Sequence, residues 1–259
     1  MTLRKGFYST PEFYEIAFNQ NRKAETDFLE ECFRRYARRP VRRVLDVACG
    51  TGSHLFRLAD RGYAVAGLDL SPENIAYVRA KATARSLSPE LIQADMTHFR
   101  VRSPFDAVVC MQDSQGHLLT NEAIVNHLRA VARALRPGGL YIFDRMIPNS
   151  WANPASRWAW TKRRGSLTIR TTFTTLKRAN LVSQVCREEI LFEIQENGNR
   201  SLLRQRHLTR VVFPQEMRAL VAQAPALEFV AWFSNFDVKK PLDRARRPIM
   251  MIPVLRKRG

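Results

Sequence analysis

A short glycine-containing turn after a run of apolar residues most constrains how this chain folds. Residues 44–52 read VLDVACGTG, which predicts a buried strand ending at Asp46 that passes into a helix through a loop with very few side chains. Backbone N–H groups and a helix N-terminus can approach a small molecule closely in such a loop. A second apolar run, residues 63–70, ends on Asp69. Two successive strands that end on acids indicate a nucleotide-type cleft at the top of a parallel sheet.

Strands and helices are predicted to alternate along the first 150 residues. Apolar runs predict further strands over 90–96, 105–113 and 140–146. Capping residues and helical periodicity predict helices from Ser9 to about Arg39 with interruptions, and over 53–61, 71–86 and 121–136. Strands and helices at this spacing predict an α/β fold with right-handed crossovers and a parallel sheet.

The pattern changes near residue 150. An irregular basic stretch is followed by three strand-like segments rich in Thr and Val, which predict an antiparallel meander inserted as a lid. A short helix and two apolar runs, 228–236 and 248–257, are expected to return to the sheet as its last hairpin. The chain therefore divides into a helical cap over the cofactor cleft (1–40), a cofactor-binding core (41–149), a β lid for the substrate (150–213) and a closing segment (214–259).

Charge and composition limit the partners of the chain. The formal net charge is +18, and the excess of basic residues lies mainly over 150–210 and 239–259. Such a field favours an anionic partner, either a small acid or phosphate compound or a nucleic acid, although a solubilising surface explains it as well. No apolar run reaches the roughly 18 residues of a membrane span. With no signal-peptide pattern and no CxxC pair, we expect a cytoplasmic protein with reduced cysteines, no metal site and no membrane contact.

Five motifs in order resemble the class I S-adenosylmethionine-dependent methyltransferases. They are VLDVACGTG (44–52), GLDLS (67–71), QADM (93–96), FDAVVCMQDSQGHLL (105–119) and LRPGGLYIFD (135–144). The match covers roughly residues 8–146 and looks most like small-molecule N- or O-methyltransferases with a β-sheet lid, of the kind found in secondary metabolism. It implies a Rossmann-like, seven-stranded, mostly parallel sheet with a final antiparallel strand. It also implies S-adenosylmethionine as cofactor, with S-adenosylhomocysteine as product.

By that resemblance, the turn and the strand-end acids hold most of the cofactor. Asp46 and the turn backbone at Ala48, Gly50 and Gly52 hold its methionine part. Asp69 accepts hydrogen bonds from both ribose hydroxyls, as the paired oxygens of a carboxylate can.

Adenine and the sulfonium are assigned to positions near the later strands. By the same resemblance Leu70 packs against adenine, Asp95 with Met96 addresses the adenine edge, and Gln112 lies under the sulfonium. Two residues of the first helical segment resemble those that close over the methionine carboxylate, namely Tyr14 and Arg22.

Methyl transfer from a sulfonium needs mainly alignment of the acceptor and exclusion of water. A base is required only if the acceptor keeps its proton until the transition state. His117, after the fourth strand, is the first candidate, as a base or as a group that orients the substrate. Asp113 is the second candidate, or an anchor of the same loop. We expect a small acceptor bearing a carboxylate or phosphate, covered by lid residues: Trp158, Trp160, Arg163, Arg164, Arg170 and Arg204.

Three alternatives remain open. A nicotinamide or flavin dinucleotide would require a third glycine in the turn, and Leu55 occupies that place. An RNA or DNA methyltransferase fits the sequence pI near 10.7. However, the fourth strand ends in MQDSQ and not in the Asn/Asp-Pro-Pro-aromatic motif of amino-group nucleic-acid methyltransferases. A non-catalytic binding protein with the same fold is the third, and a homodimer is compatible with each of them.

Overall fold

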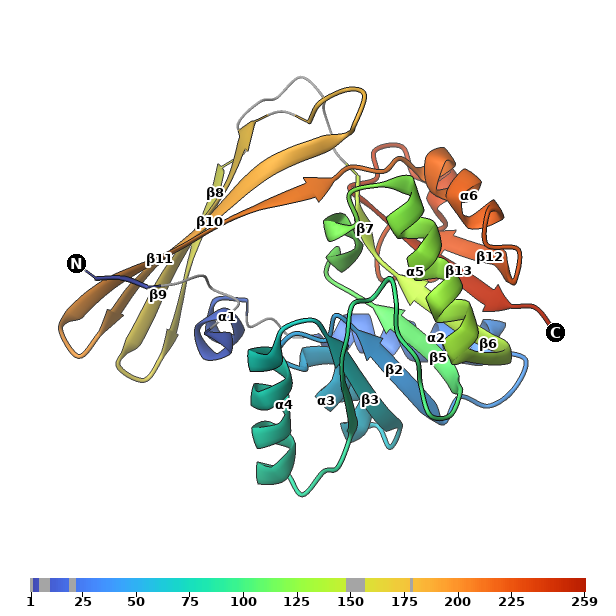
Figure 1. Ribbon diagram of the computed structural model, residues 1–259, viewed down its shortest axis with the longest axis horizontal. Helices are drawn as coiled ribbons and strands as arrows, with labels where there is room; N and C mark the ends of the chain where they lie inside the picture. Colours follow the sequence, from blue (N-terminus) through green and yellow to red (C-terminus); the bar gives the residue numbers. More distant parts are fainter. Residues whose placement is uncertain (1, 5–9, 19–21, 148–156, 178) are drawn as a thin grey trace.

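Two β-sheets of different size make up the structure (Figure 1). The computed structural model describes residues 2–4, 10–18, 22–147, 157–177 and 179–259. The larger sheet forms the core with helices on both of its faces, and the smaller sheet projects from one end of the core. No helix within these ranges is long and apolar enough to cross a membrane.

The core sheet has seven strands in the order β12-β13-β6-β5-β2-β3-β4, and the short β7 pairs with β13 beside them. Strands β2 to β6 run parallel, and β13 lies antiparallel between β6 and β12. This confirms the predicted mostly parallel sheet with a closing hairpin. The strands are β2 (Arg43–Val47), β3 (Ala64–Asp69), β4 (Glu90–Gln93), β5 (Phe105–Cys110), β6 (Leu135–Phe143), β7 (Arg145–Met146), β12 (Leu227–Phe233) and β13 (Met250–Lys257).

Helices bury apolar stripes on both faces of this sheet. Apolar residues of α5 and α6 pack on one face, and those of α2 with Leu58 of α3 pack on the other. Every residue of β5 is buried, as expected for a central parallel strand covered on both sides. The helices of the chain are α1 (Pro11–Ala17), α2 (Lys23–Tyr36), α3 (Ser53–Asp60), α4 (Pro72–Ala84), α5 (Asn121–Ala134) and α6 (Pro214–Ala222).

The smaller sheet has the order β1-β11-β10-β9-β8 and is antiparallel except for β1, which runs parallel to β11. Its apolar face packs on α1 through a cluster that includes Ile16, Ile169 and Phe192. We call this sheet the lid. Its strands are β1 (Thr2–Arg4), β8 (Arg157–Arg164), β9 (Leu167–Lys177), β10 (Val185–Glu196) and β11 (Asn199–Arg210).

Three details differ from the sequence expectation. The basic stretch expected to be irregular contains β8, because Trp158 and Trp160 alternate with the smaller or polar residues Arg157, Ala159 and Thr161 at the period of a strand. β6 begins at Leu135, and Pro137 with the two following glycines lies at a register shift against β5. The first helical segment consists of α1 and α2, while Ser9, its expected cap, lies outside the described residues.

Candidate functional site

The glycine turn between β2 and α3 has an unusual backbone. Ala48, Gly50 and Gly52 all have positive φ, at 55°, 53° and 78°. The Cys49 N–H donates to the Leu68 carbonyl over 2.9 Å, and the Gly52 N–H donates to the Cys49 carbonyl over 2.8 Å. The Gly50 N–H donates to Oδ2 of Asp69 over 2.8 Å, so the turn is tied to the end of the neighbouring strand.

Asp69 ends β3 and organises the next loop. Its Oδ1 accepts hydrogen bonds from the Ser71 N–H and from Nδ2 of Asn74. The side chain of Leu70, directly after it, is 67% exposed.

Asp46 ends β2 and is almost completely buried. Burial raises the pKa of its carboxyl to about 6. Its Oδ2 is buried without a hydrogen-bond partner in the described part of the chain. Since an unsatisfied buried oxygen costs free energy, this atom marks a position where a polar ligand group or a water is expected.

The loop after β4 is open to solvent at Asp95 and half-buried at Met96. Oδ1 of Asp95 accepts from the N–H and the hydroxyl of Thr97, both at 2.7 Å. The Met96 carbonyl accepts from Nδ1 of His127 in α5 over 2.9 Å. The hydrogen bond from α5, the helix that also packs on β5, therefore holds the predicted adenine loop in place.

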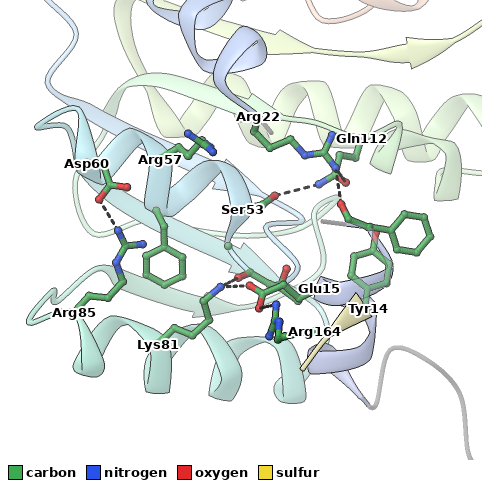
Figure 2. A pocket seen from close by; sticks show the side chains of 14 residues that line it. Tyr14, Glu15, Arg22, Ser53, Arg57, Asp60, Lys81, Arg85, Gln112 and Arg164 are labelled. Atoms are coloured by element: carbon green, nitrogen blue, oxygen red, sulfur yellow. Dashed lines mark hydrogen bonds and ion pairs between the residues drawn. The ribbon is translucent and has the colours of Figure 1, made fainter. Parts of the chain in front are cut away.

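A cleft of about 350 Å³ lies between α1, the turn and α4 (Figure 2). Tyr14, Arg22 and Gln112 line it together with the turn residues Thr51 to Ser53. Arg22 donates to Oε1 of Gln112 over 2.7 Å and to Oε1 of Glu25 over 2.8 Å, so the buried guanidinium is fixed in direction. Asp69, Leu70 and Asp95 are not among the residues that line this cleft. Of the residues predicted for the methionine end, Tyr14, Arg22 and Gly52 line the cleft together with Gln112, whereas Asp46, Ala48 and Gly50 do not line it.

Gln112 and Asp113 follow β5 with φ of 62° and 54°. Two adjacent non-glycine residues in the left-handed region store strain, which is common where a backbone is shaped for a ligand. The Asp113 N–H donates to Oδ2 of Asp144, and Oδ1 of Asp113 lies 3.1 Å from Nε of the buried Arg145. Burial raises the pKa of the Asp113 carboxyl to about 6, and Arg145 opposes this rise.

His117 ends the short 3₁₀ helix η2 (Ser114–His117) that follows Asp113. Desolvation by the surrounding protein lowers the pKa of His117 below its ordinary value, and His207 of the lid acts in the same direction. A hydrogen bond with the Leu208 backbone connects the imidazole to β11. His117 is therefore neutral at pH 7 and lies where the core meets the lid.

The predicted lid residues lie on two different faces. Trp158, Trp160 and Arg164 are paired with Phe173, Thr171 and Leu167, on the face that packs toward α1. Nε1 of Trp160 donates to the Ala17 carbonyl over 2.7 Å, and Arg164 pairs with Glu15 at 3.1 Å. The other three arginines alternate with these residues and lie on the opposite face: Arg163, Arg170 and Arg204.

That placement separates Arg164 from the other three arginines that were predicted to meet the acceptor. Arg170 lies 3.5 Å from Glu193, and Arg204 lies 3.7 Å from Glu189, both on the outer surface of the lid. The sequence showed only that these residues are basic. The register of the strands decides which face each one occupies, and a shift of one residue would reverse it.

Residues 44–139 match a family model described as a methyltransferase domain. A curated relative, dTDP-3-amino-3,4,6-trideoxy-α-D-glucopyranose N,N-dimethyltransferase of Streptomyces venezuelae, is 37% identical over 101 residues, which cover 39% of this chain and 41% of the relative. Over residues 44–139 the core of this chain is similar to a methyltransferase domain. The chain spans about half or less of the length of the curated relatives that it matches.

Solved structures share the fold of the methyltransferase domain together with the lid. An S-adenosylmethionine-dependent methyltransferase from Clostridium acetobutylicum superposes with a TM-score of 0.79 at 18% identity, covering 95% of this chain and 97% of the other. The S-adenosylmethionine-bound amino pentose methyltransferase CalS10 from Micromonospora echinaspora gives 0.74 at 23% identity, with 95% and 97% covered. The likeness extends over both sheets, and at these identities it concerns the fold alone.

Sequence reasoning missed several residues that the methyltransferase domain and the lid bring to the site. Glu15 accepts hydrogen bonds from Tyr77 over 2.8 Å and from Lys81, which links α1 to α4 beside the cleft. Arg145, Glu188 and His207 gather around Asp113 and His117. For Glu188 a signal existed, because it interrupts the apolar alternation of Cys186, Ile190 and Phe192 along β10. For His207 no such signal existed, since its neighbours on that face of β11 include Gln205 and Thr209.

Proposed function

We propose that this chain is an S-adenosylmethionine-dependent methyltransferase that methylates a nitrogen atom of a small-molecule acceptor. The observation that carries the proposal is the strand-end acid Asp69, tied to the left-handed glycine turn and followed by the exposed Leu70. These groups match a cofactor that has a ribose for Asp69, an apolar base for Leu70 and a charged amino-acid end for the turn. The curated relative from Streptomyces venezuelae acts on an amino sugar, as its name states, which supports a nitrogen acceptor.

The residues present fit such a cofactor. In this proposal Asp69 binds the ribose hydroxyls, Leu70 covers the adenine, and Asp95 with Met96 meets the adenine edge. The orphaned Oδ2 of Asp46 and the backbone of the turn then serve the methionine end. The carboxylate of that end pairs with the residues that line the other wall of the cleft, Arg22 and Tyr14.

When bound, S-adenosylmethionine supplies a methyl group on a positively charged sulfur, which keeps the bonding electron pair as the acceptor nitrogen attacks in line. The strained backbone at Gln112 and Asp113 sets the wall against which the acceptor is aligned. His117 takes the proton that the nitrogen loses, since a neutral imidazole offers a lone pair that can accept it. Its hydrogen bond to the Leu208 backbone carbonyl places a proton on one ring nitrogen, which leaves the lone pair on the other.

A negatively charged group elsewhere on the acceptor is a further part of the proposal. Its support is the net charge of +18 and the basic lid. Because Arg163, Arg170 and Arg204 lie on the outer face, they would act through the field around the lid and not through contact. We therefore expect R170Q and R204Q to raise the KM of an anionic acceptor only a few-fold, and the effect to disappear at high salt.

Calorimetry with S-adenosylhomocysteine tests the cofactor half of the proposal. We expect one site per chain, and the same experiment with NAD⁺ or FAD as ligand should show no binding. Transfer of a labelled methyl group to a panel of amines, including dTDP-3-amino-3,4,6-trideoxy-α-D-glucopyranose, tests the acceptor half. A chain that binds no S-adenosylhomocysteine, or that methylates alcohols but no amine in matched pairs, contradicts the proposal.

A further inference from the structure

A second groove lies on the core and shares no lining residue with the cleft in Figure 2. It has a volume of about 720 Å³ and lies between α5 and the loop that follows β4. Cavities that bind small organic ligands have volumes of roughly 300–1,000 Å³, so the groove is large enough for one. Three arginines line it, Arg100 from the loop and Arg129 with Arg133 from the helix.

Protein groups do not balance the charge of this groove. The described residues that line it include no carboxylate. None of the ion pairs within the described part of the chain involves Arg100, Arg129 or Arg133. The acid at the start of the same loop, Asp95, accepts hydrogen bonds from Thr97 instead. Three positive charges therefore share one cavity, and their field attracts an anion and repels a cation.

The helix places like charges beside each other. Asn126, Arg129 and Arg133 are spaced at i, i+3 and i+7, which puts them on one face of α5. Like charges four residues apart destabilise a helix. The dipole of α5 favours a cation in the last turn, where Arg133 lies, but it does not account for Arg129 or for Arg100 on the other wall. An anion between the two walls removes the repulsion among all three.

The two walls of the groove are fixed relative to each other. Nδ1 of His127 in α5 donates to the Met96 carbonyl over 2.9 Å, and Phe99 is buried in the same core cluster as the apolar residues of α5. Nη2 of Arg129 donates to the Gln223 carbonyl over 3.3 Å, which orients its guanidinium. A groove whose donors are held before the ligand arrives loses less conformational entropy on binding.

We propose that this groove binds a small organic diphosphate through the guanidinium groups of Arg100, Arg129 and Arg133. The planar fork of a guanidinium matches the oxygens of a phosphate and bonds to two of them at once. Three such groups on two walls exceed what a single carboxylate, with one charge and two oxygens, can engage. The phosphate backbone of a nucleic acid carries similar groups, but a concave groove between a loop and a helix favours a compact ligand.

The groove is separate from the proposed methyl-transfer site. None of the residues that line it is among those assigned to the cofactor or to the acceptor. Its loop does continue directly from Asp95 and Met96, which are proposed to meet the adenine edge. Binding of the diphosphate is therefore measured both with the cofactor cleft empty and with S-adenosylhomocysteine present.

Proton NMR of the histidines tests the groove, because His98 lines it and the chain has five histidines. Sodium pyrophosphate is titrated into the full chain at constant ionic strength, with sodium acetate as the control salt. We expect a saturable shift of the His98 signal with pyrophosphate and none with acetate, and H98N identifies that signal. The His207 signal, which comes from the basic lid, should not follow the same curve.

R129Q and R133Q should each weaken pyrophosphate binding at least about five-fold, because each removes hydrogen bonds to a charged group. R100Q should give a similar loss without any change in α5. Pyrophosphate should raise the urea midpoint of wild type by mass action and raise that of R129Q less. The matched control is Arg79→Gln, since Arg79 is an exposed arginine of α4 that does not line the groove. R79Q should bind pyrophosphate as wild type does.

An absent His98 shift, or equal pyrophosphate affinity in wild type, R129Q and R133Q, would overturn the site. A duplex oligonucleotide that shifts the His98 signal where pyrophosphate does not would overturn it as well, because the ligand would then be a nucleic acid. Failure of the proposed function is a different result, which would appear as absent binding of S-adenosylhomocysteine in calorimetry. R129Q and R133Q should bind S-adenosylhomocysteine with the affinity of wild type.

Discussion

At the scale of single residues, the buried carboxylates of the strand ends have different partners. Asp69 accepts from Gly50, Ser71 and Asn74, whereas Oδ2 of Asp46 accepts from no described group. The carboxylate of Asp69 holds the loop through these hydrogen bonds, and its oxygens still have a lone pair for a ligand. Asp46 has a backbone hydrogen bond with Leu55 and one buried oxygen, Oδ2, without a partner among the described residues. Both acids were predicted from sequence, but only the structure distinguishes the acid that organises a loop from the acid that keeps an unsatisfied buried oxygen.

We expect Asp69→Asn to weaken the binding of S-adenosylhomocysteine roughly ten- to hundred-fold. Hydrogen bonds to a charged group contribute about 1.5–3 kcal/mol, and the amide removes the charge while keeping the shape. Calorimetry at a temperature where the variant is folded provides the measurement. Asp237→Asn, in a loop where the Asp237 side chain is 39% exposed, serves as control and should bind as wild type does. Unchanged affinity in D69N would remove Asp69 from the proposed site.

His127 predicts a pH dependence of stability. It is completely buried and burial lowers its pKa to about 4. Its Nδ1 donates to the Met96 carbonyl, so Nε2 must accept from the Tyr141 hydroxyl, and the ring is neutral. Below pH 6.5 the unfolded chain binds a proton that the folded chain does not. The stability contributed by neutral His127 is therefore complete above pH 6.5 and is lost as the pH falls toward 4, by up to about 3 kcal/mol.

The comparison that isolates this effect is urea unfolding of wild type and H127N between pH 7.5 and 5. The carboxyls with raised pKa values, Asp46 and Asp144, give the opposite slope and occur in both proteins. We expect wild type to be more stable at pH 7.5, with a difference that narrows as the pH falls. Parallel curves for the two proteins would show that His127 is not buried as a neutral ring.

At the scale of elements, the turn before α3 contains two glycines, Gly50 and Gly52, that differ in the space available for a side chain. A Cβ on Gly50, where φ is 53°, would have no atom within 4 Å, whereas a Cβ on Gly52 would lie 2.8 Å from the ring of Phe56. Alanine at position 50 meets only the left-handed backbone penalty of about 1–2 kcal/mol. Alanine at position 52 meets that penalty and a steric contact with α3.

We therefore expect G52A to lower the free energy of unfolding by more than G50A does. Urea denaturation of the two variants and wild type measures the difference, and the pair controls for the loss of glycine in the unfolded chain. Equal destabilisation would indicate that the Phe56 ring moves aside at no cost. A larger effect at Gly50 would contradict the assignment of the two backbone positions.

At the scale of the whole molecule, Glu15 connects the lid to the core. It accepts from Tyr77 and Lys81 of α4 and pairs with Arg164 of β8, and these partners lower the pKa of its carboxyl although burial opposes them. The lid also bonds to α1 through Trp160 and the Ala17 carbonyl. One short helix, α1, thus links this end of the lid to the core, while Arg210 at the end of β11 bonds to Arg145 and Asn121 of the core.

We expect Glu15→Gln to destabilise the chain by about 1–2 kcal/mol, because it leaves the half-buried Lys81 without its charge partner. Arg164→Gln removes only the outer pair, which is half exposed, and should cost less than about 0.5 kcal/mol. Denaturant unfolding measures both, and hydrogen exchange of β8 and β9 amides reports on lid attachment. If R164Q is the more harmful of the two, Glu15 is not the connecting residue.

The amino-acid sequence by itself determined the core of this protein. The strand at residues 44–47, the glycine turn and the acids Asp46 and Asp69 were predictable because they are local patterns in which spacing alone sets backbone and burial. The tertiary structure alone decided the acceptor side. Alternation shows which lid residues share a face, but strand register and docking on α1 decide which face meets the core. For that reason Arg170 and Arg204 point away from the core, while Glu188 and His207 lie on the side of Asp113. These residues are far apart in the sequence, so no local sequence pattern could predict that they meet.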